Sequence, residues 1–504
     1  MGYIAKPLFH PAFAKATAGK KSTAQHQHGA FDLLFSLDES HREWLLATSQ
    51  ELEISAGAIL VQEGQEIESF YILIEGVMSV FHPEQQDKPI SSVGPGQVIG
   101  EMSFVEGLPA SASVKAVERC MLLQIPFDLV RQEMDRDPVF GADLHTALLH
   151  ILSSRLRLLT GKLSALQNGP AFRETVRHES LALALDNFKA AIFKTRESET
   201  KRQEDAFCQN AQTMAQAYAH LIYELQNHLG DQAPGTPQEK DSLGYKVQQE
   251  LAPYVLLSDF LNRSYTKPRG YAGDFLTIAN AYNDLAIGNG RTGELLDRIT
   301  LESPAVKAVK NRRKLLTEEI FRTIEEAKGQ PVHVTVFACG PARELFDVYA
   351  QLPDPSILKT TLIDIDLQAL SYVSDKKDAF RVPLPMELHR ENLIYLALGR
   401  RKLSLPPQDL IYSIGLIDYF NDQLVTKLSD YAHQLLRPGG RVIFGNFHPD
   451  NPQKAFMDHV IDWKLIHRNE SDMDRLFEAS AFGHASEEIR FEEERVNLFA
   501  ICRK

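Results

Sequence analysis

The sequence predicts a multidomain protein with an N-terminal β-barrel or jelly roll and its flanking helices, a helical middle region, and a C-terminal α/β sheet. Three observations predict this fold class. The chain has 504 residues, more than one hydrophobic core ordinarily organises. Residues 58–126 contain short apolar runs separated by glycine turns, which is typical of barrels and jelly rolls. From Val332 onward strand and helix patterns alternate, which indicates a mostly parallel, doubly wound sheet.

We expect four segments along the chain. Residues 1–30 are rich in Ala, Lys, His and Gln without a sustained period and are predicted to form a flexible arm. Residues 31–160 hold the barrel with its helices, residues 161–330 form a helical linker or cap, and residues 331–504 form the sheet domain. The Gly- and Pro-rich stretch at residues 230–244 is predicted to be a linker.

The helix expected after the barrel carries an apolar stripe. Its members recur at helical spacing, and they are Leu148, Leu149, Ile151, Leu152, Leu156 and Leu159. Such a stripe packs in a core or pairs with a second helix, and we favour pairing. The sequence therefore predicts a homodimer.

Composition narrows the class of protein. The formal net charge of −13 argues against broad contact with a nucleic-acid backbone. The basic run Lys307–Lys314 is a local exception, and we interpret it as a solvated helix face rather than a nucleic-acid contact. Four cysteines give neither a disulfide framework nor a metal-binding pair, so we expect no metal and a reducing, cytoplasmic location. No apolar run is long enough for a membrane helix, and no secretory signal is evident at the start.

The run from Val332 to Glu344 is the strongest candidate for a ligand site. An apolar strand leads into a turn of small residues, Ala338, Cys339, Gly340 and Pro341, and a helix pattern follows. Such a turn lets a nucleotide-like ligand approach the backbone closely. The next strand ends at Asp364, whose two carboxylate oxygens suit the paired hydroxyls of a ribose. We interpret these residues as a cofactor site in a Rossmann-like domain.

Residues 58–126 resemble the cyclic nucleotide-binding domain. The resemblance rests on Gly64, on residues 70–73 and 76–80, and on the segments 100–103 and 110–114. It implies that Gly100 opens a phosphate-binding helix, that Glu101 accepts from the ribose hydroxyl, and that Ser111 offers its backbone N–H.

The family's phosphate-binding arginine is replaced by Ala110 in this chain. Losing a charge-assisted hydrogen bond costs about 1.5–3 kcal/mol. Two hypotheses follow: the barrel is a dimerisation or docking module that no longer senses cyclic nucleotides, or it binds another nucleotide or a weaker ligand with charge supplied elsewhere.

Residues 245–504 resemble a class I methyltransferase that uses S-adenosyl-L-methionine. The turn at Cys339 matches the first motif, Asp364 the ribose-binding acid, and Leu435–Val442 the turn before the fifth strand. The resemblance implies a set of cofactor-binding residues: Ala338, Cys339, Gly340, Pro341, Asp364, Asn392, Leu393, Ser413 and Gly415.

A closer resemblance is to the bacterial family for biosynthesis of 3-hydroxypalmitic acid methyl ester. The matching segments are Lys267–Asp274, Gly415–Phe420, Gly445–Pro449 and Asp462–Arg468. This resemblance implies methyl transfer to the carboxylate of a 3-hydroxy fatty acid, a small-molecule acceptor with a role in bacterial signalling. His467 departs from the tyrosine expected there.

The glycine-bounded loop in the first of these segments is predicted to cover the cofactor. We count Arg269, Tyr271 and Asp274 among the candidate cofactor-binding residues. Arg269 is a candidate partner for an acidic substrate group or for the cofactor carboxylate. Tyr271 and Asp274 are candidate lid residues, with simple turn residues as the alternative.

Candidate catalytic residues lie where strands end on the predicted active face. Asp418, Tyr419 and His448 could each orient the acceptor or act as a base. A packed aromatic is the alternative for Tyr419, and an ordinary loop histidine is the alternative for His448. A carboxylate acceptor needs no base, because the sulfonium is already a strong electrophile.

Three alternatives to an active methyltransferase stay open. One is a Rossmann-like NAD domain, although the full glycine fingerprint is missing. The second is a methyltransferase fold without activity. The third is a non-catalytic regulatory protein whose barrel and sheet bind nucleotide or nucleoside ligands.

Overall fold

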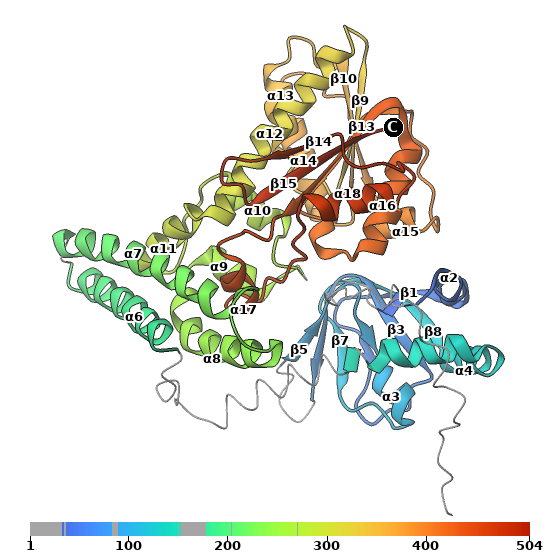
Figure 1. Ribbon diagram of the computed structural model, residues 1–504, viewed down its shortest axis with the longest axis horizontal. Coiled ribbons are helices and arrows are strands. Elements are labelled where there is room, and N and C mark those ends of the chain that lie inside the picture. Colours follow the sequence, from blue (N-terminus) through green and yellow to red (C-terminus); the bar gives the residue numbers. More distant parts are fainter. Residues whose placement is uncertain are drawn as a thin grey trace, which may run out of the picture.

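The computed structural model describes residues 33–34, 37–82, 89–149, 151–152, 178–202, 204–269 and 271–504. Within these residues the chain forms a barrel-like region, a group of long helices and a sheet domain (Figure 1). The predicted multidomain fold class is confirmed. The predicted arm at residues 1–30 lies outside the described residues, as do residues 161–177 of the predicted cap.

The N-terminal region is a sandwich of two four-stranded sheets. One sheet has the order β1-β8-β3-β6 and the other β2-β7-β4-β5. The strands are β1 (Gln50–Ile54), β2 (Ile59–Val61), β3 (Ser69–Glu75), β4 (Met78–Phe81), β5 (Pro89–Val93), β6 (Val98–Ile99), β7 (Ser113–Ala116) and β8 (Cys120–Pro126). Helix α2 (Glu39–Thr48) precedes them, α3 (Glu101–Glu106) interrupts them and α4 (Phe127–Arg136) follows. Apolar side chains between the sheets, such as Leu73, Met78 and Leu122, are fully buried.

The predicted leucine stripe is divided in the structure. Leu148 is buried in the core of its own chain, whereas Leu149 on the next position is 61% exposed. Leu156 and Leu159 lie outside the described residues. The homodimer therefore stays a prediction.

Among the described residues between 178 and 330, the structure contains seven helices. They are α6 (Glu179–Thr200), α7 (Glu204–Leu229), α8 (Pro237–Val255), α9 (Asp259–Thr266), α10 (Phe275–Tyr282), α11 (Gly290–Leu301) and α12 (Pro304–Glu326). The linker predicted at residues 230–244 is shorter than expected. Thr236 and Glu239 form a capping box that starts α8 at Pro237, so the second half of that stretch is helical.

A seven-stranded sheet forms the C-terminal domain, in the order β11-β10-β9-β12-β13-β15-β14. The strands are β9 (Val332–Phe337), β10 (Leu358–Asp364), β11 (Met386–Arg390), β12 (Gln408–Ile414), β13 (Leu436–Phe447), β14 (Glu488–Phe491) and β15 (Asn497–Arg503). Strands β9 to β13 pair in parallel, and β15 runs antiparallel to both of its neighbours. Because the parallel strands are covered on both faces, β9 and β12 are almost entirely buried.

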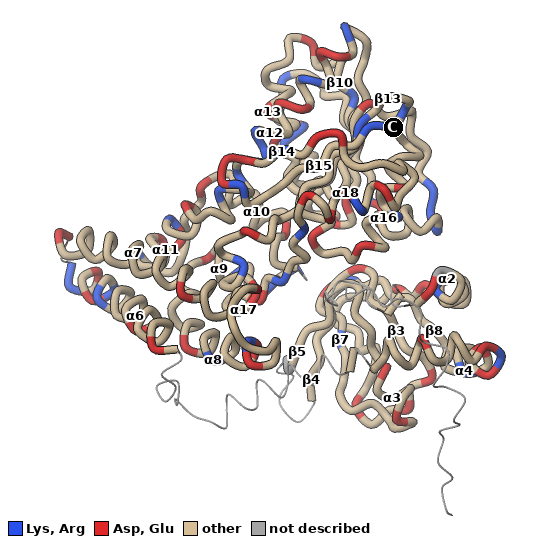
Figure 2. The backbone as a smooth tube through the Cα atoms, in the orientation of Figure 1, with Lys and Arg blue, Asp and Glu red and all other residues tan. Residues whose placement is uncertain are grey.

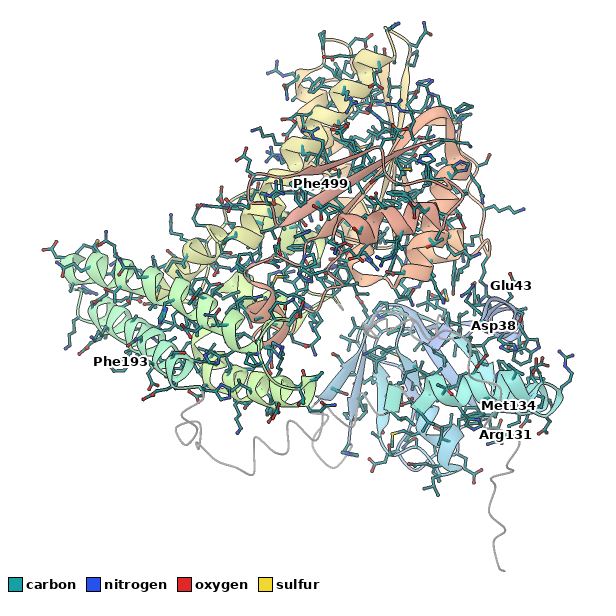
Figure 3. All side chains as sticks on the ribbon, viewed as in Figure 1. Asp38, Glu43, Arg131, Met134, Phe193 and Phe499 are labelled. Carbon is teal, nitrogen blue, oxygen red and sulfur yellow. The ribbon has the colours of Figure 1, made fainter. Side chains whose placement is uncertain are left out.

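The helices that surround this sheet are α12, α13 (Arg343–Gln351), α14 (Leu367–Asp378), α15 (Leu393–Ala397), α16 (Asp422–Leu435) and α18 (Glu470–Glu478) (Figure 1). Helix α17 (Lys454–His459) instead packs against α7 and α8 of the helical region (Figure 1). The sheet core is tightly packed. Phe499 on β15, labelled in Figure 3, is fully buried, and a Cβ at Gly445 would come within 3.0 Å of its ring.

The segment Leu435–Val442, predicted to be a turn, lies largely in the first part of β13. The pairing register shifts between Gln408 and Leu410, and Gly439 has a positive φ of 77°. The prolyl-glycyl-glycyl sequence therefore forms an irregularity at the strand entry. In the part of the chain that the structure describes, no helix has the length and apolarity to cross a bilayer.

Candidate functional site

The predicted cofactor residues gather at the carboxyl edge of the sheet. Strands β10, β9 and β12 are parallel neighbours, and Ile363 pairs with Phe337 while Tyr412 pairs with Val336. Their carboxyl ends therefore meet at one edge, where open α/β sheets bind their ligands. The turn after β9, Asp364 and Gly415 all lie at this edge.

The turn after β9 adopts an unusual backbone. Ala338, Gly340 and Ala342 all have positive φ, at 54°, 51° and 47°. Alanines seldom adopt this conformation, because the Cβ crowds the backbone, and non-glycine residues held there often mark functional sites. The glycine-like geometry expected of this turn is therefore present although only one of the three residues is glycine.

Asp364 is joined directly to this turn. Its Oδ2 accepts a hydrogen bond from the Gly340 amide at 2.9 Å, and its Oδ1 accepts from the Asp366 amide at 2.9 Å. Burial raises the pKa of Asp364 to about 6, against the opposing effect of these hydrogen bonds. Burial also raises the pKa of the neighbouring Cys339 thiol, so this side chain lines the site in its neutral form.

Arg269 from the predicted lid lies at this edge. It forms a two-pronged ion pair with Asp366 and also donates to Gln368. The ring of Tyr271 lies 6.4 Å, centroid to centroid, from the ring of Tyr419. Burial and the nearby charge of Asp364 raise the pKa of Tyr271, so its hydroxyl stays protonated. The loop thus places one cation and one neutral phenol beside the candidate ribose-binding carboxylate.

Asp274 has a different environment from Tyr271. It is completely buried, caps α10 through the amides of Leu276 and Thr277, and forms an ion pair with Arg263 at 2.9 Å. These contacts hold α9 and α10 together, and they favour the turn interpretation of Asp274 over a lid.

Three further predicted cofactor residues serve local structure as well. The Asn392 side chain caps α15 by accepting from the amides of Ile394 and Tyr395, and Leu393 is buried. The Ser413 hydroxyl donates to the Phe337 carbonyl at 3.0 Å, which ties β12 to β9. The structure places all three at the ends of strands β11 and β12.

The three candidate catalytic residues follow two neighbouring parallel strands, β12 and β13. Asp418 and Tyr419 lie in the 3-10 turn Ile417–Tyr419 after β12. Asp418 accepts from the Phe447 amide at 2.7 Å, and burial raises its pKa to about 6. The Tyr419 hydroxyl accepts from the Trp463 indole at 3.0 Å.

His448 follows the neighbouring strand β13 and has different side-chain contacts. Its Nε2 lies 3.2 Å from Glu470 on α18, and its ring packs edge-on against Phe491 of β14. Because β12 and β13 are parallel, all three residues follow carboxyl ends at the same edge of the sheet, and His448 lies one strand further out, beside β14. These contacts favour the loop-histidine interpretation of His448.

Sequence reasoning missed Arg312. It belongs to the basic run 307–314, which we interpreted as a solvated face, yet its side chain is only 6% exposed. A Cβ at Gly415 would lie 2.9 Å from its Nη1, so the guanidinium reaches the end of β12. The neighbouring Arg313 does pair outward, with Asp347. A helical spacing could have raised the question, because Val309, Arg312 and Leu316 share one face of α12.

A small apolar cavity of about 30 Å³ lies between the helical region and the sheet domain. It is lined by side chains from both parts, among them Tyr218, Phe260, Val306, Phe447, Met457 and Trp463. Trp463 connects it to the hydroxyl of Tyr419. The apolar cavity is therefore adjacent to Tyr419, one of the candidate catalytic residues.

The barrel keeps part of the expected nucleotide site. Gly100 has φ of 89° and precedes α3, and Glu101 in the first turn is buried. Ala110 packs its methyl group in the barrel core, and its backbone pairs with Gln65 and Gly64. Ser111 beside it is exposed. The position of the family's arginine is thus filled by an apolar contact.

The barrel contacts the sheet domain near the cofactor edge. We call Glu51, Glu75 and Glu118 the acidic rim. Glu51 lies 3.7 Å from Arg401, and Glu75 pairs with Arg390 at the end of β11. Burial raises the pKa of Glu118, and Arg269 opposes that shift. Figure 2 shows acidic positions on this part of the barrel, below the sheet domain.

Comparison with known proteins accounts for both regions. Residues 51–137 match the family model "Cyclic nucleotide-binding domain", and residues 269–493 match the family model "Putative methyltransferase". The chain carries both domains. The barrel corresponds to the first match, and the sheet domain corresponds to the second, which ends before β15.

Among curated proteins, the chain is similar to the cAMP-activated global transcriptional regulator CRP of Salmonella typhimurium. The two are 26% identical over 127 residues, which are 25% of this chain and 59% of the relative. CRP of Escherichia coli O157:H7 matches with the same identity and coverage. The chain thus spans 59% of the length of these relatives.

Solved structures match at lower similarity. A cyclic nucleotide-binding domain from Methylobacillus flagellatus is 23% identical and aligns with 26% of this chain and 82% of its own, with a TM-score of 0.24. A possible exported protein from Bordetella parapertussis is 19% identical and aligns with 64% of this chain and 96% of its own, with a TM-score of 0.41.

Proposed function

We propose that this protein is an S-adenosyl-L-methionine-dependent methyltransferase that acts on a small molecule. The observation that carries the proposal is the hydrogen bond between Asp364 and the Gly340 amide, because it joins a strained backbone turn to a buried carboxylate at one sheet edge. The turn would receive the amino-acid end of the cofactor, and the carboxylate would receive the ribose hydroxyls. The family match at residues 269–493 supports this assignment.

The chemistry asks the protein mainly for position and for exclusion of water. The bound cofactor supplies the electrophilic methyl group. The chain must align the acceptor with it, and Asp418, Tyr419 and Tyr271 surround the place where β12 ends. The hydroxyl of Tyr419 is already held by Trp463, so its orientation is fixed before the acceptor arrives.

For the acceptor we propose a carboxylate on an apolar chain, such as a 3-hydroxy fatty acid. The apolar cavity beside Trp463 supports the chain. At about 30 Å³ the cavity holds little more than one water molecule, so its lining side chains must rearrange to admit such a chain. A carboxylate is nucleophilic at neutral pH without a base, so the proposal needs no general base, and the His448 ring already contacts Glu470.

We propose that the barrel modulates this activity through the acidic rim. The rim lies against Arg390 and Arg269, next to the candidate ribose site. Binding of a ligand in the barrel would thus change the contacts at the cofactor edge. Because a buried alanine, Ala110, replaces the phosphate-binding arginine, we favour a ligand other than cyclic AMP or cyclic GMP. Calorimetry with both compounds and with cyclic dinucleotides tests this, and tight binding of cyclic AMP would contradict it.

One experiment tests the enzyme itself. The purified full chain is titrated with S-adenosylhomocysteine and with NAD, then incubated with S-adenosylmethionine and 3-hydroxy acids. We expect the protein to bind S-adenosylhomocysteine and not NAD. We expect a methylated product only when an acceptor is present. Binding without turnover over a broad acceptor set would instead favour a regulatory protein, and binding of NAD alone would refute the assignment.

A further inference from the structure

Arg312 is a buried cation without a buried anion against it. Its side chain is 6% exposed, and its Nε has no hydrogen-bond partner. In the described part of the chain no carboxylate oxygen forms an ion pair with its guanidinium, and the polar group beside it is the Tyr282 hydroxyl. Burying an unpaired charge is costly, so such a group needs a physical reason to be there.

The other two most buried arginines of the sheet domain are fully engaged. Arg468 donates to Asp422, to Asn446 and to the carbonyls of Ile417 and Phe420. Arg441 donates to Thr323 and lies within ion-pair distance of Glu319 and Glu326. Arg312 therefore stands apart from side chains of the same type in the same domain.

The nearest acidic groups do not neutralise Arg312 at contact distance. Glu344 on α13 and Asp418 after β12 interact with it through space, and burial raises the pKa of both. Each has another partner: Glu344 accepts from the Tyr412 hydroxyl at 2.8 Å, and Asp418 accepts from the Phe447 amide at 2.7 Å. The guanidinium lies between the helix that follows the cofactor turn and the end of β12.

We propose that Arg312 binds the carboxylate of a ligand in the methyl-transfer site. The inference rests on the proposed function and names a binding residue for it. A guanidinium offers a planar pair of donors that matches a carboxylate, and the pairing gains most where water is excluded. Two carboxylates reach such a site: that of the cofactor's amino-acid portion and that of the acceptor.

The first part of the test distinguishes these sources with cofactor analogues. Wild type and Arg312→Gln are titrated calorimetrically with S-adenosylhomocysteine and with 5′-methylthioadenosine, which lacks the amino-acid portion. If Arg312 binds the cofactor carboxylate, the substitution weakens S-adenosylhomocysteine about 10- to 100-fold and leaves methylthioadenosine nearly unchanged.

The second part uses the acceptor. The complex with S-adenosylhomocysteine is titrated with 3-hydroxypalmitate and with its methyl ester. If Arg312 binds the acceptor carboxylate, Arg312→Gln weakens the acid about 10- to 100-fold and not the ester. Arg312→Lys keeps the charge without the planar pair of donors, and we expect a smaller loss of the same ligand.

Two variants guard the interpretation. Arg313→Gln removes the adjacent arginine, which pairs outward with Asp347, and should change none of the four affinities. Arg312→Lys keeps the charge at the same position, so it should show the same selectivity with a smaller loss if Arg312→Gln does not fold.

The remaining outcomes overturn the proposal. Equal losses for both members of each ligand pair, or no loss for any ligand, mean that Arg312 has a structural role while the proposed function stands. If wild type binds neither cofactor analogue, the proposed function fails, and the role of Arg312 fails with it.

Discussion

At the scale of single residues, the candidate site depends on buried charge. Asp364, Asp418 and Arg312 are all nearly inaccessible at one sheet edge, and burial raises the pKa of both carboxyl groups to about 6. A site prepared in this way loses little further solvation when a ligand enters. The same burial disfavours the ionised carboxylates in the ligand-free protein. The folded state is therefore less stable at neutral pH, while the site is already arranged for its ligand.

The first prediction concerns Asp364 and pH. In the proposed function, its ionised form accepts from two ribose hydroxyls, so affinity for S-adenosylhomocysteine should rise as pH increases through about 6. Asp364→Asn should weaken binding at pH 7.5 by about 1–3 kcal/mol and remove most of this pH dependence. Calorimetry between pH 5 and pH 8 measures both, in steps of about half a unit around the pKa.

The same substitution should have the opposite effect on the stability of the ligand-free protein: at neutral pH it weakens ligand binding but favours folding. Because the pKa of Asp364 is raised on folding, its contribution to stability is present below the ordinary value of 3.8 and is lost as pH rises through about 6. The free energy of unfolding of Asp364→Asn, relative to that of wild type, should therefore be highest at neutral pH. A variant that is less stable than wild type at pH 7.5, and relatively better at pH 4.5, would contradict this sign.

At the scale of elements, close backbone contacts fix how the helical region meets the sheet domain. Helix α8 crosses α17 at Gly244, where a Cβ would lie 2.4 Å from the His459 ring. His459 is buried there, and burial lowers its pKa to about 4, so the ring is neutral at this contact. Helix α17 also lines the apolar cavity through Phe456 and Met457.

The second prediction follows from this crossing. Gly244→Ala should lower the free energy of unfolding by about 1–3 kcal/mol, because an added methyl group forces the two helices apart. Denaturant unfolding followed by circular dichroism measures the change. Asp241→Ala, at an exposed position of the same helix, is the matched control and should stay within about 0.5 kcal/mol of wild type. Similar stability of the two variants would show that the crossing is not tight.

At the scale of the whole molecule, the barrel and the sheet domain meet through opposite charges. The acidic rim faces Arg401, Arg390 and Arg269, while Arg400 donates to Ser49 at 3.1 Å and Arg42 to Gln423 at 3.1 Å. Most of these side chains are partly exposed, so each pair contributes little and salt weakens it. A contact built in this way can be released by a modest change in the barrel.

The third prediction tests whether the rim limits access to the cofactor edge. Glu75→Gln and Glu118→Gln should together increase the association rate of S-adenosylhomocysteine about two- to tenfold, because the barrel then detaches more readily from Arg390 and Arg269. Stopped-flow fluorescence measures the rate, and high salt should reproduce the effect in wild type. Glu63→Gln, which breaks a pair with His82 inside the barrel, is the control. Unchanged rates in the double variant would show that the rim does not gate the site.

Much of this architecture is readable from the chain. Glycine turns among short apolar runs predicted the sandwich, and the alternation after Val332 predicted the sheet, because strand and helix periodicities are local properties. The turn after β9 and the acid at the end of β10 were also predicted, since parallel strands bring their carboxyl ends to one edge. The length of the 230–244 linker was wrong because the capping box at Thr236 was overlooked.

What only the tertiary structure decided is which polar groups find partners. In the sequence, Asp274 and His448 were functional candidates, as Tyr271 and Asp418 were. In the structure, Asp274 pairs with Arg263 and His448 contacts Glu470. Arg312 looked like part of a solvated basic run, yet it is buried at the end of β12. Local sequence sets periodicity and turns, whereas the partner of a charge depends on how neighbouring elements pack. This holds even for Arg263 and Asp274, 11 positions apart, and for His448 and Glu470, 22 positions apart.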